Sequence, residues 1–221
     1  MDGFYDVGPL TGQLVVLEPL GIEHVPGLVA AAQAGRDRYA LTGVPADEAE
    51  AREYVARTIA GRDTNSVLAF ATYSRRTERV VGSTRFCNFE HWRWQDKHRR
   101  RAAEIPDAVE IGGTWLAQDA QRTGVNREAK LLMLRVAFER WAVHRVRLRT
   151  DARNERSRAA IAALGAHFDG VLRAETAGYD GAIRDSATYS ILHSEWPTIR
   201  ETIEASLSRR RGSVEPLAAG K

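Results

Sequence analysis

The sequence predicts a single domain that mixes helices and strands, an α/β (α+β) fold. Strand-like and helix-like patterns alternate along the chain, and three consecutive strands have the pattern of an antiparallel meander. Of the 221 residues, 43% are hydrophobic, which is enough for one core of ordinary size. We expect the domain to span residues 1–208 and the small, polar and basic residues 209–221 to form a flexible tail.

The composition argues against several classes of protein. The single cysteine, Cys87, rules out an intramolecular disulfide, and the start MDGFYDVGPL lacks the basic flank and apolar run of a secretory signal. No apolar segment approaches the roughly 20 residues that cross a bilayer. We therefore expect a cytoplasmic protein that does not contact membranes. The six histidines show no ligand spacing such as H-E-x-x-H, so no metal is expected.

The elements of the first half follow in order. The β-branched run QLVVLEPL (13–20) predicts a strand, and IEHVPGLVAAAQA (22–34) predicts a helix with Pro26 near its start. A second helix is expected from Pro45, with acids in its first turn and Gly61 as its stop. Three strands follow, SVLAFATYS (66–74), ERVVGSTRF (78–86) and AVEIGGTWLA (108–117), and they form the predicted meander.

The second half repeats the alternation. After the loop QDAQRTGVN (118–126), the helix REAKLLMLRVAFERW (127–141) carries a wide apolar stripe that packs on a sheet. The alternation in HRVRLRTDA (144–152) predicts a half-buried strand, and a short helix from Glu155 to Leu164 has Asn154 as its cap and Gly165 as its end. The last elements are the strands HFDGVLRAE (167–175) and DSATYSILHSEW (185–196) and the helix EWPTIRETIEASLSRR (195–210).

The start of the helix after residue 126 has the composition of an anion site. A first helical turn leaves backbone N–H groups without intrahelical partners, and Gly124 removes the side chain that would block an approaching group. Arg122, Arg127 and Lys130 surround this turn, where they disfavour the helix dipole but favour a bound phosphate. A glycine before a helix is also common in ordinary loops. No G-x-x-x-x-G-K-[ST] and no G-x-G-x-x-G after a strand is present, so a P-loop and a dinucleotide fold are disfavoured.

QRTGVN (121–126) resembles the Q/R-x-x-G-x-G/A acetyl-coenzyme A loop of the GNAT superfamily of N-acetyltransferases, with Asn126 where Gly or Ala is usual. The longer pattern is EIGGTWLAQDAQRTGVNREAKLLML, then FERW, HRVRLRTDARNERSRAAIAALGAHFDGVLR, DGAIRDSATYSIL and EWP. It is similar to the branch of bacterial ribosomal-protein alanine N-acetyltransferases (RimJ/RimL-like), in which G-V-N-x-E-A-K is the usual form. The resemblance covers Val15 to Leu207.

The resemblance implies a fold and a set of site residues. It implies a strongly bent, mixed, mostly antiparallel sheet with helices on both faces, and acetyl-coenzyme A as co-substrate. The backbone N–H groups from Arg122 to Arg127 would hold the pyrophosphate, the strand Ile111–Leu116 would lie beside the pantetheine, and the strand Arg145–Thr150 would splay away from it. The implied coenzyme-binding residues are Trp115, Leu116, Gln121, Arg122, Thr123, Gly124, Val125, Asn126, Arg127, Asn154 and Ser157. Trp115 could also be an ordinary core residue.

The candidate catalytic residues come from partial matches to the catalytic positions of the family. The tyrosine that many members use to protonate the leaving thiolate is replaced by Ile161, so Ser157 is the candidate substitute; its alternative role is a residue of the first helical turn beside its cap. Glu110 and Glu175 are the candidate bases, and each could instead be a solvated carboxylate. Backbone N–H groups of the TWLA strand would polarise the thioester carbonyl.

The resulting prediction is an enzyme, an acetyl-coenzyme A-dependent N-acetyltransferase that acts on a primary amine, either a peptide N-terminus or a small molecule. A homodimer is plausible through the last strands or the terminal helix. The alternative is a nucleic-acid-binding or ribosome-associated protein, because the segment 91–104, HWRWQDKHRRRAAE, interleaves Trp92 and Trp94 with basic residues. That segment could equally be a solvated loop, and the net charge of only +3 argues against nucleic-acid binding over the whole surface.

Overall fold

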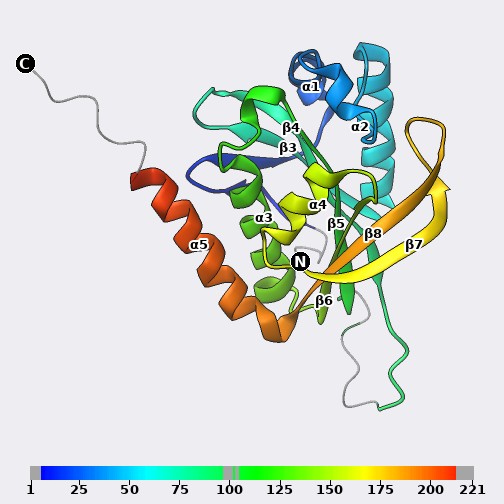
Figure 1. Cartoon of the computed structure of the whole chain (residues 1–221), viewed down its shortest axis with the longest axis vertical. Helices are drawn as coiled ribbons and strands as arrows, with labels where there is room; N and C mark the ends of the chain where they lie inside the picture. The colour runs from blue at the N-terminus through cyan, green and yellow to red at the C-terminus, as the bar shows by residue number, and fades with distance from the viewer. Residues whose placement is uncertain (1–5, 97–101, 103–104, 213–221) are drawn as a thin grey trace, which may run out of the picture.

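One eight-stranded sheet organises the computed structural model, which describes residues 6–96, 102 and 105–212 (Figure 1). The strand order is β1-β2-β3-β4-β5-β6-β8-β7, and every neighbouring pair is antiparallel except β5 and β6, which are parallel. The mixed, mostly antiparallel sheet that the family resemblance implied is therefore confirmed. The strands are β1 (Leu10–Thr11), β2 (Val15–Pro19), β3 (Val67–Ser74), β4 (Arg79–Glu90), β5 (Ala108–Leu116), β6 (Arg145–Asp151), β7 (His167–Ala177) and β8 (Ile183–Leu192).

Helices cover both faces of the sheet. The helices are α1 (Val25–Ala32), α2 (Glu48–Asp63), α3 (Val125–Arg135), α4 (Glu155–Ala162) and α5 (Trp196–Gly212). Successive side chains of a strand point to opposite faces. Ser83 of β4 bonds to Tyr54 of α2, whereas the next residue, Thr84, bonds to Lys130 of α3. The helices α2 and α3 therefore lie on opposite faces of β4, and Figure 1 shows α5 packed outside α3.

Several helix boundaries differ from the sequence prediction. The helix α2 begins at Glu48 and not at Pro45, because the carboxylate of Asp47 caps it by accepting the N–H of Glu50 at 2.9 Å. It continues through Gly61 to Asp63. The helix α3 begins at Val125, two residues earlier than expected, and passes into a π-helical turn at Val136–Arg140. The helix α5 extends to Gly212, so residues 209–212 are helical; residues 213–221 lie outside the described residues.

The core lies between the sheet and these helices. Phe70, Phe86 and Trp141 are fully buried. Phe86 contacts Phe70 edge to face and Trp141 at a tilt, with the Phe86 and Trp141 ring centroids 4.7 Å apart. The apolar stripe of α3 is buried as the sequence predicted. Short 3-10 segments connect the elements at Ile22–His24, Arg36–Tyr39, Gln118–Ala120 and His193–Glu195. Within the described ranges, no helix is long and apolar enough to span a membrane.

The sheet is divided at β5 and β6. Their parallel pairing covers three positions, from Ala108 opposite Arg145 to Glu110 opposite Arg147. Beyond this point β5 keeps its pairing with β4, and β6 keeps its pairing with β8, but the two strands no longer pair with each other. The predicted splay between them is therefore present, and the facing backbone edges are open to a ligand.

Candidate functional site

One large cavity, of about 1490 Å³, lies along this opening. Among the residues expected at the site, it is lined by Glu110, Trp115, Leu116, Gln121, Arg122, Gly124, Asn126, Arg127, Asn154 and Ser157. Thr123, Val125 and Glu175 do not line it. The structure thus brings the expected loop, strand and helix start together around one space, although these segments come from separate parts of the chain.

The loop before α3 presents unpaired backbone amides. The first intrahelical bond runs from the N–H of Glu128 to the carbonyl of Gly124 at 3.0 Å, so the amides before Glu128 have no intrahelical acceptor. Within the described part of the chain, the N–H groups of Arg122, Thr123 and Gly124 donate to no protein acceptor, while the Thr123 hydroxyl is used locally, on the carbonyl of Ala120. This arrangement suits an anion.

Gly124 is required for a different reason than the sequence suggested. It caps α3 in the left-handed conformation, with φ at +98°, which L side chains rarely adopt. A Cβ at this position would lie 3.0 Å from Leu14 Cδ1 and 3.8 Å from Leu207 Cδ2, so its surroundings are filled. Backbone conformation and tight packing, rather than an open approach for a ligand, explain this glycine.

Three arginines surround the amides. The guanidinium of Arg122 has no ion pair or hydrogen bond among the described residues, whereas Arg127 is held by the Ser206 hydroxyl and by the Ala163 carbonyl at 3.4 Å. Arg210 of α5, which sequence reasoning missed, donates to the Arg122 carbonyl at 2.8 Å and also lines the cavity. Lys130, expected beside the first turn, is instead only 4% exposed and points toward the sheet.

The open edge of β5 forms one wall of the cavity. The carbonyl of Leu116 accepts hydrogen bonds from the Tyr39 hydroxyl and from Gln121 Nε2, both at 3.0 Å. The expected coenzyme-binding side chain of Gln121 therefore anchors the loop to the strand. Trp115 is buried, with its ring 6.2 Å from that of Tyr39 in an edge arrangement, so it serves both as core and as cavity wall.

A β-bulge interrupts this strand. The pairing of β4 with β5 shifts between Ser83 and Arg85, and Gly113 adopts a φ of +56°. A Cβ on Gly113 would lie 2.7 Å from Arg85 Nε, so the Arg85 guanidinium lies directly against this glycine. Residues 112–115, at this bulge, line the cavity.

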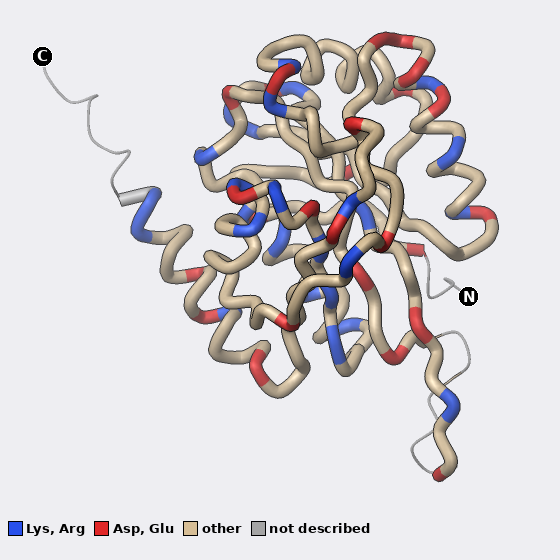
Figure 2. Tube along the Cα trace, turned by 45° about the vertical axis from the view of Figure 1, so that its right-hand side comes forward, with Lys and Arg blue, Asp and Glu red and all other residues tan. Residues whose placement is uncertain are grey.

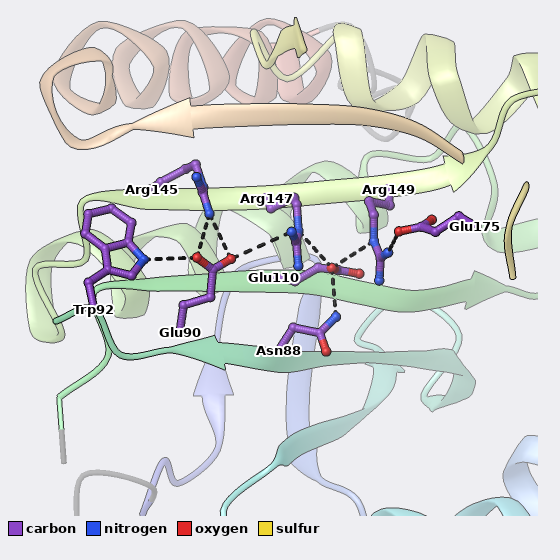
Figure 3. A network of polar contacts seen from close by, with 8 residues as sticks. All are labelled: Asn88, Glu90, Trp92, Glu110, Arg145, Arg147, Arg149 and Glu175. Carbon is purple, nitrogen blue, oxygen red and sulfur yellow. Dashed lines mark hydrogen bonds and ion pairs between the residues drawn. The ribbon is translucent and has the colours of Figure 1, made fainter. Parts of the chain in front are cut away.

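Glu110 lies where β5 and β6 separate. Its Oε2 accepts the side-chain amide of Asn88 at 2.9 Å and forms ion pairs with Nε of Arg147 at 3.1 Å and Nε of Arg149 at 2.9 Å (Figure 3). Its Oε1 accepts no hydrogen bond among the described residues and lies beside Gly112, where a Cβ would be 3.2 Å away. One carboxylate oxygen is thus held in place while the other has no hydrogen bond among the described residues, and Glu110 lines the cavity.

Glu175 belongs to the same network but does not line the cavity. Its carboxylate pairs with the guanidinium of Arg149 (Figure 3). Burial raises the pKa of Glu175, but the Ser186 hydroxyl and the Arg149 guanidinium outweigh burial, and the pKa is lowered overall. A carboxylate that does not line the cavity and whose basicity is lowered is a poor general base for a ligand bound there.

Asn154 and Ser157 lie at the start of α4. The Oδ1 of Asn154 accepts the N–H of Ser157 at 3.0 Å, so Asn154 is the helix cap that the sequence predicted. The Ser157 hydroxyl makes no hydrogen bond with any described residue and lines the cavity. The cap therefore positions a hydroxyl that is available to a ligand.

Part of the cavity lining was not anticipated from the sequence. It comprises Tyr54 of α2, residues 41–45 between the first two helices, and Tyr179 and Arg184 of the β7–β8 hairpin. These residues occupy loops and helix surfaces without a motif, so only their aromatic and basic character could have drawn attention to them.

The two tryptophans of the basic segment take part in internal contacts. Trp92 stacks on His144 with centroids 5.6 Å apart, and its indole N–H donates to Glu90 at 3.1 Å; Trp94 donates to Asp107 at 2.9 Å. Lys97, Arg99, Arg100, Arg101 and Glu104 lie outside the described residues. Figure 2 shows basic and acidic positions interspersed along the trace. The described part of the segment thus gives no support to nucleic-acid binding.

Comparison with known proteins identifies related chains. A family profile described as Acetyltransferase (GNAT) domain matches residues 15–167. A proposed acetyltransferase from T. thermophilus is 30% identical, with 91% of this chain and 97% of that chain covered and a TM-score of 0.75. A search of curated proteins finds no match.

Two further solved structures share the fold at lower identity. A GCN5-related N-acetyltransferase from Brucella melitensis is 24% identical over 89% of this chain and 84% of its own, with a TM-score of 0.74. Mycobacterium smegmatis RimJ in complex with CoA-disulfide is 19% identical over 90% of this chain and 91% of its own, with a TM-score of 0.72.

Proposed function

Because the chain belongs to the GNAT family of acetyltransferases and is therefore an acyl-transferring enzyme, we propose that it transfers an acetyl group from acetyl-coenzyme A to a primary amine by direct attack on the thioester. One observation carries this proposal: the unpaired amides before α3 and the open edges of β5 and β6 border the same cavity. Such amides suit a pyrophosphate, and an open strand edge suits the amides of pantetheine.

The described residues fit the coenzyme by charge as well as by hydrogen bonding. Arg122 and Arg210 line the cavity beside the amide cradle, and Arg122 has no protein partner among the described residues. Cations beside a helix start destabilise the helix unless an anion is bound there. When bound, acetyl-coenzyme A would supply the activated acetyl group, and the protein would hold it by these groups.

Glu110 is the base that we assign. An α-amino group has a pKa near 8, so about one molecule in ten is neutral at pH 7 and weak assistance suffices. A lysine amine near 10.4 would need about 4 to 5 kcal/mol for the same deprotonation. Both carboxylates are paired with arginines, but only Glu110 lines the cavity, and its Oε1 accepts no hydrogen bond among the described residues, so this oxygen can orient and deprotonate an incoming ammonium. These features favour an α-amine acceptor.

We place a peptide N-terminus first among acceptors. The resemblance of the motifs to the ribosomal-protein branch supports this choice. Fold alone does not select an acceptor, and small-molecule amines remain the second class to test. Ser157, with its unpaired hydroxyl, is the residue that we assign to hydrogen bonding with the coenzyme sulfur.

Homodimerisation stays a prediction. The edge strand β7 and its hairpin expose Phe168, Val171, Leu172 and Ile183, each more than 40% accessible. Size-exclusion chromatography with light scattering measures the oligomeric state directly, and a Leu172→Glu variant would identify this edge as the contact.

Titration calorimetry with acetyl-coenzyme A, coenzyme A and a longer acyl-coenzyme A, at two salt concentrations, tests the proposal. Micromolar binding is expected, and thiol release with peptide and small-amine acceptors then identifies the substrate.

Arg122→Glu is expected to weaken coenzyme binding at least tenfold because it places a carboxylate beside the phosphates. Arg173→Glu on β7, outside the cavity, changes the net charge equally and serves as control. Equal affinity of both variants would remove Arg122 from the cradle; no binding by the wild type would overturn the function.

A further inference from the structure

Lys130 is a buried cation beside the proposed site. It lies on α3, is 4% exposed, and its Nζ is 2.8 Å from Thr84 Oγ1 and 2.5 Å from Thr114 Oγ1. Within the described residues no carboxylate forms an ion pair with it. Lysine is almost never fully buried unless it is paired, so a packing role alone does not account for this residue.

The surroundings of Lys130 leave its proton exchangeable near neutral pH. Burial lowers the pKa of Lys130 to about 7, with a small opposing effect of Cys87 on β4. Burial also raises the pKa of the Cys87 thiol to about 11, so that thiol is neutral. The carboxylates on the adjoining elements are engaged elsewhere: Glu110 of β5 in its arginine pairs, and Glu128 of α3 on backbone amides of residues 13–15.

Only one of the two hydroxyl groups that contact Lys130 lines the cavity. Thr114, on β5 immediately after Gly113, lines the cavity, as does Lys130, whereas Thr84 is 1% exposed and does not. The two hydroxyls are 2.8 Å apart. Thr114 therefore connects a buried ammonium to the strand along which the thioester is expected to lie.

A hydroxyl group becomes an effective acid when a second group replaces the proton that it donates. Ser157, the hydroxyl assigned to the coenzyme sulfur, has no such group among the described residues, and the tyrosine position of the family is Ile161. Thr114 has one, because the ammonium of Lys130 donates directly to its Oγ1. Among the described residues, Thr114 is thus a cavity-lining hydroxyl that contacts a proton donor, Lys130.

We propose that Lys130 is the proton reserve for the leaving thiolate of coenzyme A and acts through the hydroxyl of Thr114. The inference rests on the acetyltransferase function proposed above. As the carbon–sulfur bond breaks and its electron pair passes to sulfur, Thr114 Oγ1 gives its proton to the sulfur and receives one from Lys130 Nζ. Lys130 is left as a neutral amine and regains a proton from solvent, which receives the proton that the acetylated amine loses. Lys130 is therefore a positioning and proton-supplying residue, and Thr114 is the group that gives the sulfur its proton, beside the hydrogen bond assigned to Ser157.

Ionisation of the thiol of bound coenzyme A provides a test that does not depend on knowing the acceptor. The ultraviolet absorbance of the thiolate is followed against pH in the complex, with desulfo-coenzyme A as the matched reference. An adjacent proton acceptor and cation should make the bound thiol at least tenfold more acidic in the wild type than in Lys130→Met or Thr114→Val. Thr84→Val removes the other hydroxyl that contacts Lys130 and should leave the thiol acidity within twofold of the wild type.

The outcomes separate the proton role from a structural one. Equal thiol acidity in the wild type and in Lys130→Met would overturn the proposal, as would equal effects of Thr114→Val and Thr84→Val. Absence of coenzyme binding in calorimetry would instead remove the proposed function. If Lys130→Met fails to fold, Lys130→Arg provides the test, because arginine keeps the charge but does not release a proton near neutral pH. It should retain coenzyme affinity and lose at least tenfold in kcat on the best amine, and wild-type turnover of this variant would contradict the relay.

Discussion

At the scale of single residues, Lys130 also links stability to pH. Its folded-state pKa is lowered to about 7, whereas an unfolded lysine titrates near 10.4. Between these values the unfolded chain holds a proton that the folded protein has released, so stability rises with pH across that window. Lys130→Met lacks this titration, and the Thr84 and Thr114 hydroxyls can still bond to each other.

We therefore expect Lys130→Met to be more stable than the wild type at pH 7, by about 1 to 4 kcal/mol, as when buried ionic groups are replaced by apolar ones. The difference should shrink as the pH is raised toward about 9.5. Urea denaturation at both pH values measures it. A difference that stays constant with pH would show that Lys130 keeps an ordinary pKa in the folded protein.

The two glutamates of the arginine network make a second test at the residue scale. Glu110→Gln removes the carboxylate that borders the cavity, and Glu175→Gln removes one that does not. With an α-amine acceptor, about one molecule in ten of which is already neutral at pH 7, we expect the first change to lower kcat/KM by about tenfold and the second by much less. Steady-state thiol release measures both. The reverse order would assign the base to Glu175.

At the scale of elements, Glu128 explains the acidic position of the G-V-N-x-E-A-K pattern. Although it lies in the first turn of α3, its carboxylate accepts three backbone amides at the entrance of β2: Gln13 at 3.0 Å, Leu14 at 2.6 Å and Val15 at 3.0 Å. It thereby fixes the N-terminal strand to the helix that carries the amide cradle.

Glu128→Ala should therefore destabilise the protein by about 3 kcal/mol or more, because it leaves buried or partly buried amides without acceptors. Glu128→Gln keeps one acceptor oxygen, so its stability should lie between that of the wild type and that of Glu128→Ala. Thermal unfolding of the three proteins provides the comparison. If the alanine variant lost less than about 1 kcal/mol, water would have to satisfy the three amides.

Elements and caps were predictable where local signals agree. Asn154 caps α4 as the sequence indicated, although the helix ends at Ala162, two residues before the expected Leu164. The strand β6 alternates in burial as its spacing predicted. Lys130 was misplaced because helical periodicity assigns a face but does not tell whether a long polar side chain turns outward or into the sheet. Its partners, Thr84 and Thr114, are distant in sequence and meet only through the register of β4 and β5.

At the scale of the whole molecule, the sheet consists of two halves. Three parallel residue pairs join them, together with ion pairs that run from Glu90 with Arg145, at 2.8 Å, to Glu110 with Arg147 and Arg149 (Figure 3). The motif resemblance implied the splay, but its exact extent depends on where this ladder stops. No local pattern marks that point, because Arg145, Arg147 and Arg149 alternate without interruption through it.

A ligand that occupies the opening should complete the sheet and couple its halves. We expect amide hydrogen exchange to slow in β5 beyond Glu110 and in β6 beyond Arg147 when acetyl-coenzyme A binds, because both strand edges are unpaired there. The pairing of β3 with β4, on the far side of one half, should change little. At 100 times the dissociation constant the ligand adds about 2.7 kcal/mol of stability, which for a chain of this size raises Tm by about 5 to 10 °C. Stabilisation with protection confined to the loop before α3 would mean that the coenzyme is held by its phosphates alone and leaves the opening empty.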